Sequence, residues 1–269
     1  MIKEKAFFWP RLFYESLAPS ERRLTSEKSV LKLQQANSHL WQALNIYDDF
    51  LDGAGTAPKL PEANRHFRKF LEIYYRLNLP SNFYCLFNKV MDDLDSANRE
   101  ESRGLIIKNN GIRSLKNLSR KSLALGLGPL AILSGGGEKM SGRRAEAVLN
   151  FFRYALAAKQ LSDDARDWRE DLKAGKITVA NNFFGKKLSA GRASLIKKPD
   201  EETKLNLLFA SKSAPILIDR IDKLSKLSRK EIKKSGLANT ALLADAILLP
   251  LETGVGESRF FLSLLQSSA

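Results

Sequence analysis

The segment IYDDFLDG at residues 46–53 and the segment QLSDDARDWREDLKAGKI at residues 160–177 carry two acidic clusters with the same spacing. Residues four apart lie on one face of a helix, so Asp48 and Asp52 share a face, as do Asp163, Asp167 and Asp171. Carboxylates stacked in this way repel each other by roughly 0.2–0.5 kcal/mol per pair, which favours a cationic partner. Magnesium is the natural candidate, because it prefers oxygen ligands and combines one or two carboxylates with substrate phosphates.

The first cluster stands at the end of an expected helix. Gly53 follows Asp52 directly, and Gly55, Pro58 and Pro61 are expected to keep the next residues out of a helix. The end of a helix is unfavourable for carboxylates, because the helix dipole is negative there. A sequence that tolerates this conflict favours a functional site at that position.

Helical periodicity runs through most of the chain, and alternating strand patterns are scarce. The sequence therefore predicts an all-α protein, a helical bundle forming one domain over residues 1–269. Helices are expected over about 26–52, 62–77 and 143–173, with a further helix containing MDDLDSANRE at 91–100, whose acids predict an exposed charged face. The segment LSRKSLALGLGPLAILSGGG at 118–137 predicts a bent apolar helix that Ser119 caps.

The composition limits where the protein is expected to be found and which classes of partner it can bind. The single cysteine, Cys85, excludes an intramolecular disulfide, and no signal peptide or membrane span is evident, so a cytoplasmic protein is expected. The net charge is +14, and residues 186–234 hold 14 Lys or Arg against 6 Asp or Glu. Such a field suits phosphorylated substrates or peripheral contact with an anionic membrane, whereas the absence of a nucleic-acid module argues against specific nucleic-acid binding. A homodimer is compatible with the sequence.

The two clusters together resemble the aspartate-rich motifs of the class I isoprenoid synthases. Residues 48–52, DDFLD, look like the first motif of polyprenyl diphosphate synthases, and residues 160–167 look like the second. Residues 166–177, with Arg-Asp, Glu-Asp and Gly-Lys-Ile, are more similar to squalene and phytoene synthases, although Lys176 replaces an arginine there. Two such motifs in the right order, 115 residues apart, form a far more specific pattern than one DDxxD.

The resemblance implies an all-α fold with a central apolar cavity and several Mg²⁺ ions that hold the diphosphate of an allylic prenyl substrate. It implies that Asp48, Asp52, Asp163 and Asp167 act in catalysis. The metal-binding residues that it implies are Asp48, Asp49, Asp52, Asp163, Asp164, Asp167 and Asp171. The residues expected to contact the diphosphate are Lys121, Lys176 and Arg259.

The kind of reaction stays open. Prenyl transfer, as in squalene, phytoene or polyprenyl diphosphate synthases, is the leading expectation. A second binding segment for isopentenyl diphosphate is not recognisable, so chain elongation lacks one of its usual signatures. Cyclisation of a single prenyl diphosphate is an alternative. A noncatalytic basic helical protein that binds membrane or nucleic acid is another.

Overall fold

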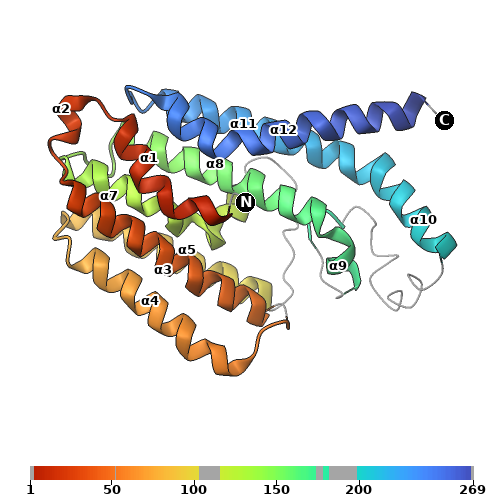
Figure 1. Cartoon of the computed structure of the whole chain (residues 1–269), viewed down its shortest axis with the longest axis horizontal. Helices are drawn as coiled ribbons and strands as arrows, with labels where there is room; N and C mark the ends of the chain where they lie inside the picture. The colour runs from red at the N-terminus through yellow and green to blue at the C-terminus, as the bar shows by residue number, and fades with distance from the viewer. Residues whose placement is uncertain (1–2, 52, 103–115, 174–177, 182–198, 268–269) are drawn as a thin grey trace.

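The computed structural model describes residues 3–51, 53–102, 116–173, 178–181 and 199–267, and every regular element in these ranges is helical (Figure 1). The first half contains η1 (Lys3–Phe8), α1 (Trp9–Ser16), α2 (Pro19–Arg22), α3 (Glu27–Leu51), η2 (Ala57–Lys59), α4 (Leu60–Tyr75) and α5 (Ser81–Ser102). The second half contains η3 (Lys116–Lys121), η4 (Leu123–Gly126), α7 (Leu127–Gly135), α8 (Arg143–Arg166), α9 (Trp168–Lys173), α10 (Pro199–Leu208), the π-helical turn η8 (Phe209–Ser213), α11 (Ala214–Lys233) and α12 (Thr240–Ser267). The expected all-α helical bundle is confirmed.

Helix α3 carries the first acidic cluster and is fixed to the core over most of its length. Leu33, Leu40 and Leu44 are buried on one face, at the spacing expected of a helix that packs on a core. The buried amide of Asn37 donates hydrogen bonds to the carbonyl oxygens of Ala6 in η1, at 3.1 Å, and Leu125 in η4, at 2.9 Å. These two bonds hold η4, which follows closely after Lys121, at a defined place beside α3.

Helices α4 and α5 pack through an aromatic cluster. Phe70 and Tyr74 of α4 meet Phe83 and Phe87 of α5, with ring centroids 5.0–5.9 Å apart in the pairs that cross between the two helices. All four side chains are at most 1% exposed. Burial of large aromatic rings contributes strongly to core energetics, so this cluster joins α4 to α5, while the backbone of α4 packs chiefly along α3.

Helix α8 carries the second acidic cluster and runs through the centre of the bundle (Figure 1). Buried residues occupy consecutive positions at 155–158, so neighbours surround the helix on all sides. It packs against α11, η3, η4, α7 and α12. The Ser228 hydroxyl of α11 also donates a hydrogen bond to the carbonyl oxygen of Phe151, at 2.8 Å.

The segment before α8 differs from the expected bent helix. It forms the short helices η3 and η4 and only then α7, and Ser119 lies buried within η3 instead of capping a helix. Close packing explains why the segment contains glycines. A Cβ at Gly126 would lie 2.9 Å from Cγ of Phe152, and one at Gly128 would lie 2.6 Å from Cγ of Pro10. The backbone here therefore approaches the protein's own side chains.

Two expected helix boundaries are also corrected. Helix α4 begins at Leu60, so Pro61 lies in its first turn, where a proline costs no hydrogen bond. The helix expected over 143–173 is interrupted at Asp167, whose φ of −95° and ψ of 9° separate α8 from α9. Immediately after the break, Trp168 is buried and stacks on Phe209, with ring centroids 4.5 Å apart.

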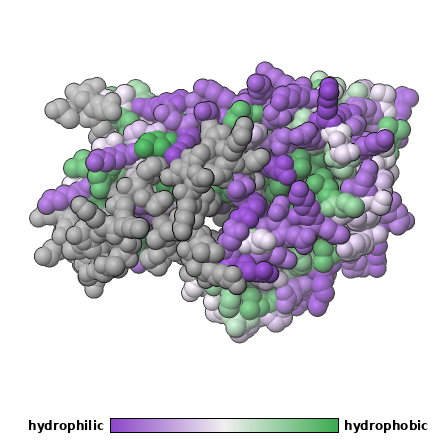
Figure 2. Space-filling model, turned by 180° about the vertical axis from the view of Figure 1, so that it is seen from behind, coloured by the Kyte–Doolittle hydropathy of each residue, from purple (hydrophilic) through white to green (hydrophobic). Residues whose placement is uncertain are grey.

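One continuous hydrophobic core joins these helices, from Ala6 near the start of the chain to Val255 in α12. Among the residues that Figure 2 colours, hydrophilic ones dominate the visible face, and apolar ones gather in small separate groups. None of the described helices combines the length and apolarity that a membrane crossing requires.

Candidate active site

The first acidic cluster lies in the last turns of α3, as the sequence predicts. Asp48 is half-exposed and Asp49 is exposed, whereas Asp52 lies outside the described residues. Gly53 adopts a φ of 73°, the left-handed conformation that commonly ends a helix. The amide groups of Ala54 and Gly55 both donate hydrogen bonds to the carbonyl oxygen of Asp49, which satisfies part of the helix end.

Lys121, expected to contact a diphosphate, reaches this cluster. Its Nζ lies 2.9 Å from Oδ1 of Asp48, and the two side chains are 25% and 47% exposed. The pair joins the last residue of η3 to the end of α3. Because half of the Asp48 carboxylate still faces solvent, the ion pair is accessible to a ligand, and exposed pairs of this kind contribute little to stability.

A second ion pair holds η3 in place. Arg120 donates two hydrogen bonds to the carboxylate of Glu100 in α5, one of them at 3.1 Å. The hydrogen bond from Arg120 lowers the pKa of Glu100, so the carboxylate stays ionised. A bidentate contact between arginine and carboxylate fixes direction as well as distance. Because η3 also packs against α8, contacts with two helices fix the position of Lys121.

The second acidic cluster lies at the junction of α8 and α9, and cations of the same helix engage it. Oδ2 of Asp163 lies 2.5 Å from Nζ of Lys159, and Oδ1 lies 2.9 Å from Nη2 of Arg166. Arg166 also donates to Asp167 through Nε, at 3.0 Å. These cations offset the repulsion between the stacked carboxylates, so the repulsion by itself does not require a metal ion.

Asp164 differs from its neighbours because it is buried, with 7% of its surface exposed. Gln160 donates a hydrogen bond from Nε2 to its Oδ1 at 2.8 Å. Burial raises the pKa of Asp164 to about 7, and the negative charges of Asp171 and Asp163 add to this effect. The carboxyl group is therefore near its point of half-protonation in neutral solution, unlike an ordinary surface aspartate.

The remaining expected residues lie in different surroundings. Asp171 is half-exposed in α9, and its amide group donates to the carbonyl oxygen of Asp167 at 3.0 Å, so helical bonding continues across the break. Lys176 lies outside the described residues. Arg259 of α12 pairs with Asp219 and Asp222 of α11, at 2.9 Å from each. Two carboxylates therefore already engage the Arg259 guanidinium.

The described side chains do not form a preassembled metal cage. Within the part of the chain that the structure describes, no three His, Cys, Asp or Glu side chains come together closely enough to hold a metal ion. Magnesium, however, needs only one or two carboxylates when phosphate oxygens and waters complete its coordination. Asp48 and Asp163 both offer partly accessible oxygens of the kind that magnesium prefers. The donor atoms therefore fit a magnesium ion that arrives with a diphosphate.

A large cavity lies on another face of α8. Its volume is about 640 Å³, and its lining comes from α8, η8, α11 and α12 and includes no residue of α3. From α8 it takes Ser162, Ala165 and Arg166, whereas Asp163 and Asp167 point to other sides of the helix. This cavity is therefore distinct from the central cavity that the sequence led us to expect between the two acidic helices.

Several partners of the site were missed from the sequence. Lys159 stands four residues before Asp163, a spacing that predicts an ion pair on a helix, and could have been found. The contact between Glu100 and Arg120 joins distant segments and gives no such signal. The two histidines face each other between α3 and α4: Nδ1 of His39 lies 3.0 Å from Nδ1 of His66.

Comparison with known proteins supports the fold. The chain matches no family model and no curated protein. Among solved structures it is similar to one described as the crystal structure of geranylgeranyl pyrophosphate synthase, with a TM-score of 0.67 and 14% sequence identity. The match covers 91% of this chain and 87% of that one. Nearly the whole chain therefore has the all-α fold of that synthase.

Proposed function

We propose that residues 1–269 form a single-domain, magnesium-dependent isoprenoid synthase that ionises an allylic prenyl diphosphate and transfers the prenyl group. The observation that carries the proposal is the contact between Lys121 and Asp48 at the end of α3. It brings the lysine expected to contact a diphosphate to a carboxylate expected to bind metal, in a chain with the fold of a geranylgeranyl pyrophosphate synthase. The second cluster, on α8, supplies the further carboxylates.

In this proposal the acids divide by their accessibility. Asp48, Asp49 and Asp52 from the first cluster, and Asp163, Asp167 and Asp171 from the second, would hold magnesium. Bound magnesium would neutralise charge on the departing diphosphate. Lys121 would exchange Asp48 for a diphosphate oxygen, and Lys176 and Arg259 would be further diphosphate contacts. Asp164 would not bind magnesium directly, because its buried carboxyl group is poorly suited to carry a full charge.

Cations of the chain itself would have to move when the substrate binds. Lys159 and Arg166 occupy Asp163, as Lys121 occupies Asp48. The pair between Lys121 and Asp48 is partly exposed, and pairs of this kind are worth about 0–1 kcal/mol, so a magnesium diphosphate can displace it at small cost. The side chains of Lys159 and Asp163 are only 15% and 19% exposed, so separating them costs more unless the diphosphate replaces the lost contact. The cations released in this way would then be available to the negative diphosphate.

The same ion pairs support a second candidate, a noncatalytic basic protein. If the acids serve only to pair with Lys121, Lys159 and Arg166, no metal is needed and the net charge of +14 is left to bind an anionic surface. This candidate predicts binding to anionic liposomes at low salt and no release of pyrophosphate from any prenyl diphosphate.

The test is pyrophosphate release from farnesyl or geranylgeranyl diphosphate with Mg²⁺, with and without isopentenyl diphosphate, followed by product identification. The products distinguish transfer of the prenyl group to a second substrate from cyclisation of a single prenyl diphosphate. Asp48→Asn and Asp163→Asn should each lower turnover by at least about a hundredfold, because they remove charge stabilisation realised when the bond breaks. Asp92→Asn is the matched control, since Asp92 is an exposed acid of the similar MDDLD segment in α5.

Equal loss of activity in the Asp92 variant would contradict the assignment of the site. Failure of the unmodified protein to release pyrophosphate from either substrate, alone or with isopentenyl diphosphate, would refute the enzymatic proposal and favour the noncatalytic one.

A further inference from the structure

The cavity on the far side of α8 from the acids has the size and lining of a small-molecule binding site. At about 640 Å³ it lies well inside the range of roughly 300–1,000 Å³ that is common for such sites. The space is partly open to the surface between the packed helices, so a small molecule can reach it from solvent.

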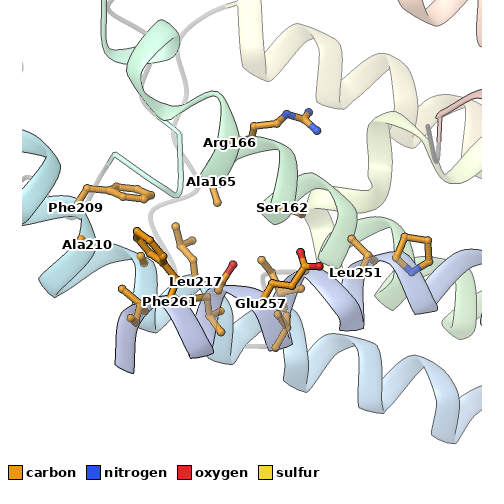
Figure 3. Close-up of a pocket in the computed structure, with 17 residues that line it drawn as sticks. Ser162, Ala165, Arg166, Phe209, Ala210, Leu217, Leu251, Glu257 and Phe261 are labelled. Carbon is orange, nitrogen blue, oxygen red and sulfur yellow. The ribbon is translucent and has the colours of Figure 1, made fainter. Parts of the chain in front are cut away.

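Small residues on three elements create the space. Ala165 of α8, Ala210 of η8 and Gly254 of α12 all line it, and each leaves room that a larger side chain would fill. Leu217 and Ile221 of α11 add large apolar side chains to the lining. Figure 3 shows Phe209 and Phe261 close to each other at one end of this space. The walls therefore offer dispersion contacts along their whole length and suit an aliphatic chain.

The polar groups of the lining favour a neutral ligand over an anionic one. Arg166 contributes its stem, and in Figure 3 its guanidinium is directed away from the cavity, consistent with its hydrogen bonds to Asp163 and Asp167. The carboxylate of Glu257 and the hydroxyl groups of Ser162 and Ser258 are the other polar side chains of the lining. A carboxylate would repel an anion, whereas hydroxyl groups can bind the hydroxyl end of an alcohol.

The cavity also has an apolar way in. Phe261, which lines it, is 62% exposed, and the adjacent Phe260 is 67% exposed. The exposed ring of Phe261 can contact an apolar chain at the opening of the cavity. The neighbouring wall contains the π-helical turn η8, and π-helical turns are frequent at functional sites.

We propose that this cavity binds a long, uncharged apolar chain that ends in a hydroxyl or other neutral group. Both an isoprenoid alcohol and a fatty alcohol have this chemistry, and the test below distinguishes them. The site is separate from the acidic clusters, so the inference does not depend on the proposed synthase activity. Binding would place the chain along α11 and α12, with the small residues of α8 and η8 against it.

Gly254 offers a sharp test, because a Cβ at this position would have no heavy atom within 4 Å and would project from a residue that lines the cavity. Gly254→Leu should fill part of the space. Gly256 is the matched control: it lies two residues further along α12, a Cβ there is equally unobstructed, and it does not line the cavity. Both changes replace glycine by a good helix former within a helix, so both variants should fold.

The full-length protein and both variants would be titrated with geranylgeraniol and with oleyl alcohol, each delivered from cyclodextrin. Binding would be followed by calorimetry and by the emission of Trp168, which stacks on the cavity residue Phe209. We expect Gly254→Leu to weaken binding by at least about tenfold and Gly256→Leu to leave it within about twofold, a difference of at least about fivefold, or about 1 kcal/mol. Preference for geranylgeraniol would identify an isoprenoid ligand, and preference for oleyl alcohol an acyl-chain ligand.

Three results would overturn the inference: no binding of either alcohol to the unmodified protein, equal loss in the two glycine variants, or a change of molecular mass in solution caused by Gly254→Leu without a change in alcohol affinity. The last result would assign the face to contact between two copies. Asp48→Asn separates this inference from the proposed function, because it should abolish turnover and leave alcohol binding unchanged.

Discussion

Replacing Asp164 with asparagine should stabilise the protein in neutral and alkaline solution. Asparagine keeps the shape of the side chain and its carbonyl oxygen, so Gln160 can still donate its hydrogen bond. What the substitution removes is a charge in a position that is only 7% exposed. Burying an ionised carboxylate is costly, and this cost appears as the rise in the pKa of Asp164 to about 7 from 3.8.

The size and the direction of the effect follow from that rise. Folded Asp164 keeps its proton up to a pH of about 7, whereas the unfolded chain releases it near 3.8, so folding takes up a proton between these values and stability falls as the pH rises. The raised pKa lowers the free energy of unfolding by about 2 kcal/mol near pH 5 and by about 4 kcal/mol near pH 8. Asp164→Asn should recover most of it, which corresponds to a melting temperature roughly 10 °C higher near pH 8.

The assay is thermal and urea unfolding of both proteins near pH 5 and near pH 8, in EDTA so that no metal ion contributes. Asp163→Asn is the control. It removes a carboxylate that Lys159 and Arg166 hold, so it should not stabilise at either pH. The reasoning fails if Asp164→Asn is no more stable than the unmodified protein near pH 8, or if its gain is the same at both pH values.

Three further predictions concern other contacts. Lys121→Met should raise the KM for a prenyl diphosphate by at least about tenfold in steady-state assays, whereas Lys121→Arg, which keeps the positive charge, should raise it less. An unchanged KM in the Lys121→Met variant would contradict the diphosphate role. Burial, and to a smaller extent repulsion from His66 and Lys69, lowers the pKa of His39, so its contribution to stability is complete above a pH of about 6.5 and is lost as the pH falls. His39→Gln should flatten this part of the stability profile in urea titrations, and an unchanged profile would contradict the reasoning. Gly126→Ala should destabilise by about 1–3 kcal/mol in the same titrations, because its Cβ would meet Phe152 at 2.9 Å, and a neutral result would show that the ring can move aside.

The helical class and the carriers of the acidic clusters could be predicted from the sequence because both depend on local periodicity. The helix expected over 26–52 is α3, and Asp48 and Asp49 fall in its last turn as expected, whereas Asp52 lies outside the described residues. The segment at 118–137 could not be predicted in the same way. Its short helices depend on the close approach of Gly126 to Phe152 and of Gly128 to Pro10, which are contacts between distant residues.

The candidate site, like the fold, could be predicted from the sequence only in part. The types of residue suited to magnesium and diphosphate are visible in the sequence, and so is the order of the two clusters. Which cation meets which acid is not, apart from pairs within one helix such as Lys159 and Asp163. The different character of Asp164 is also invisible, because adjacent aspartates look alike until packing buries one of them and leaves its neighbour half-exposed.

By itself, the sequence determined that this protein is helical and that Asp48 and Asp163 stand near the ends of core helices, because side-chain periodicity along one helix is a local property. Only the tertiary structure decided that Lys121 reaches Asp48, that α8 breaks at Asp167, and that the large cavity opens on the side of α8 away from the acids. These features depend on how distant helices pack. Packing is set by the shapes and volumes of side chains that meet only after the chain has folded.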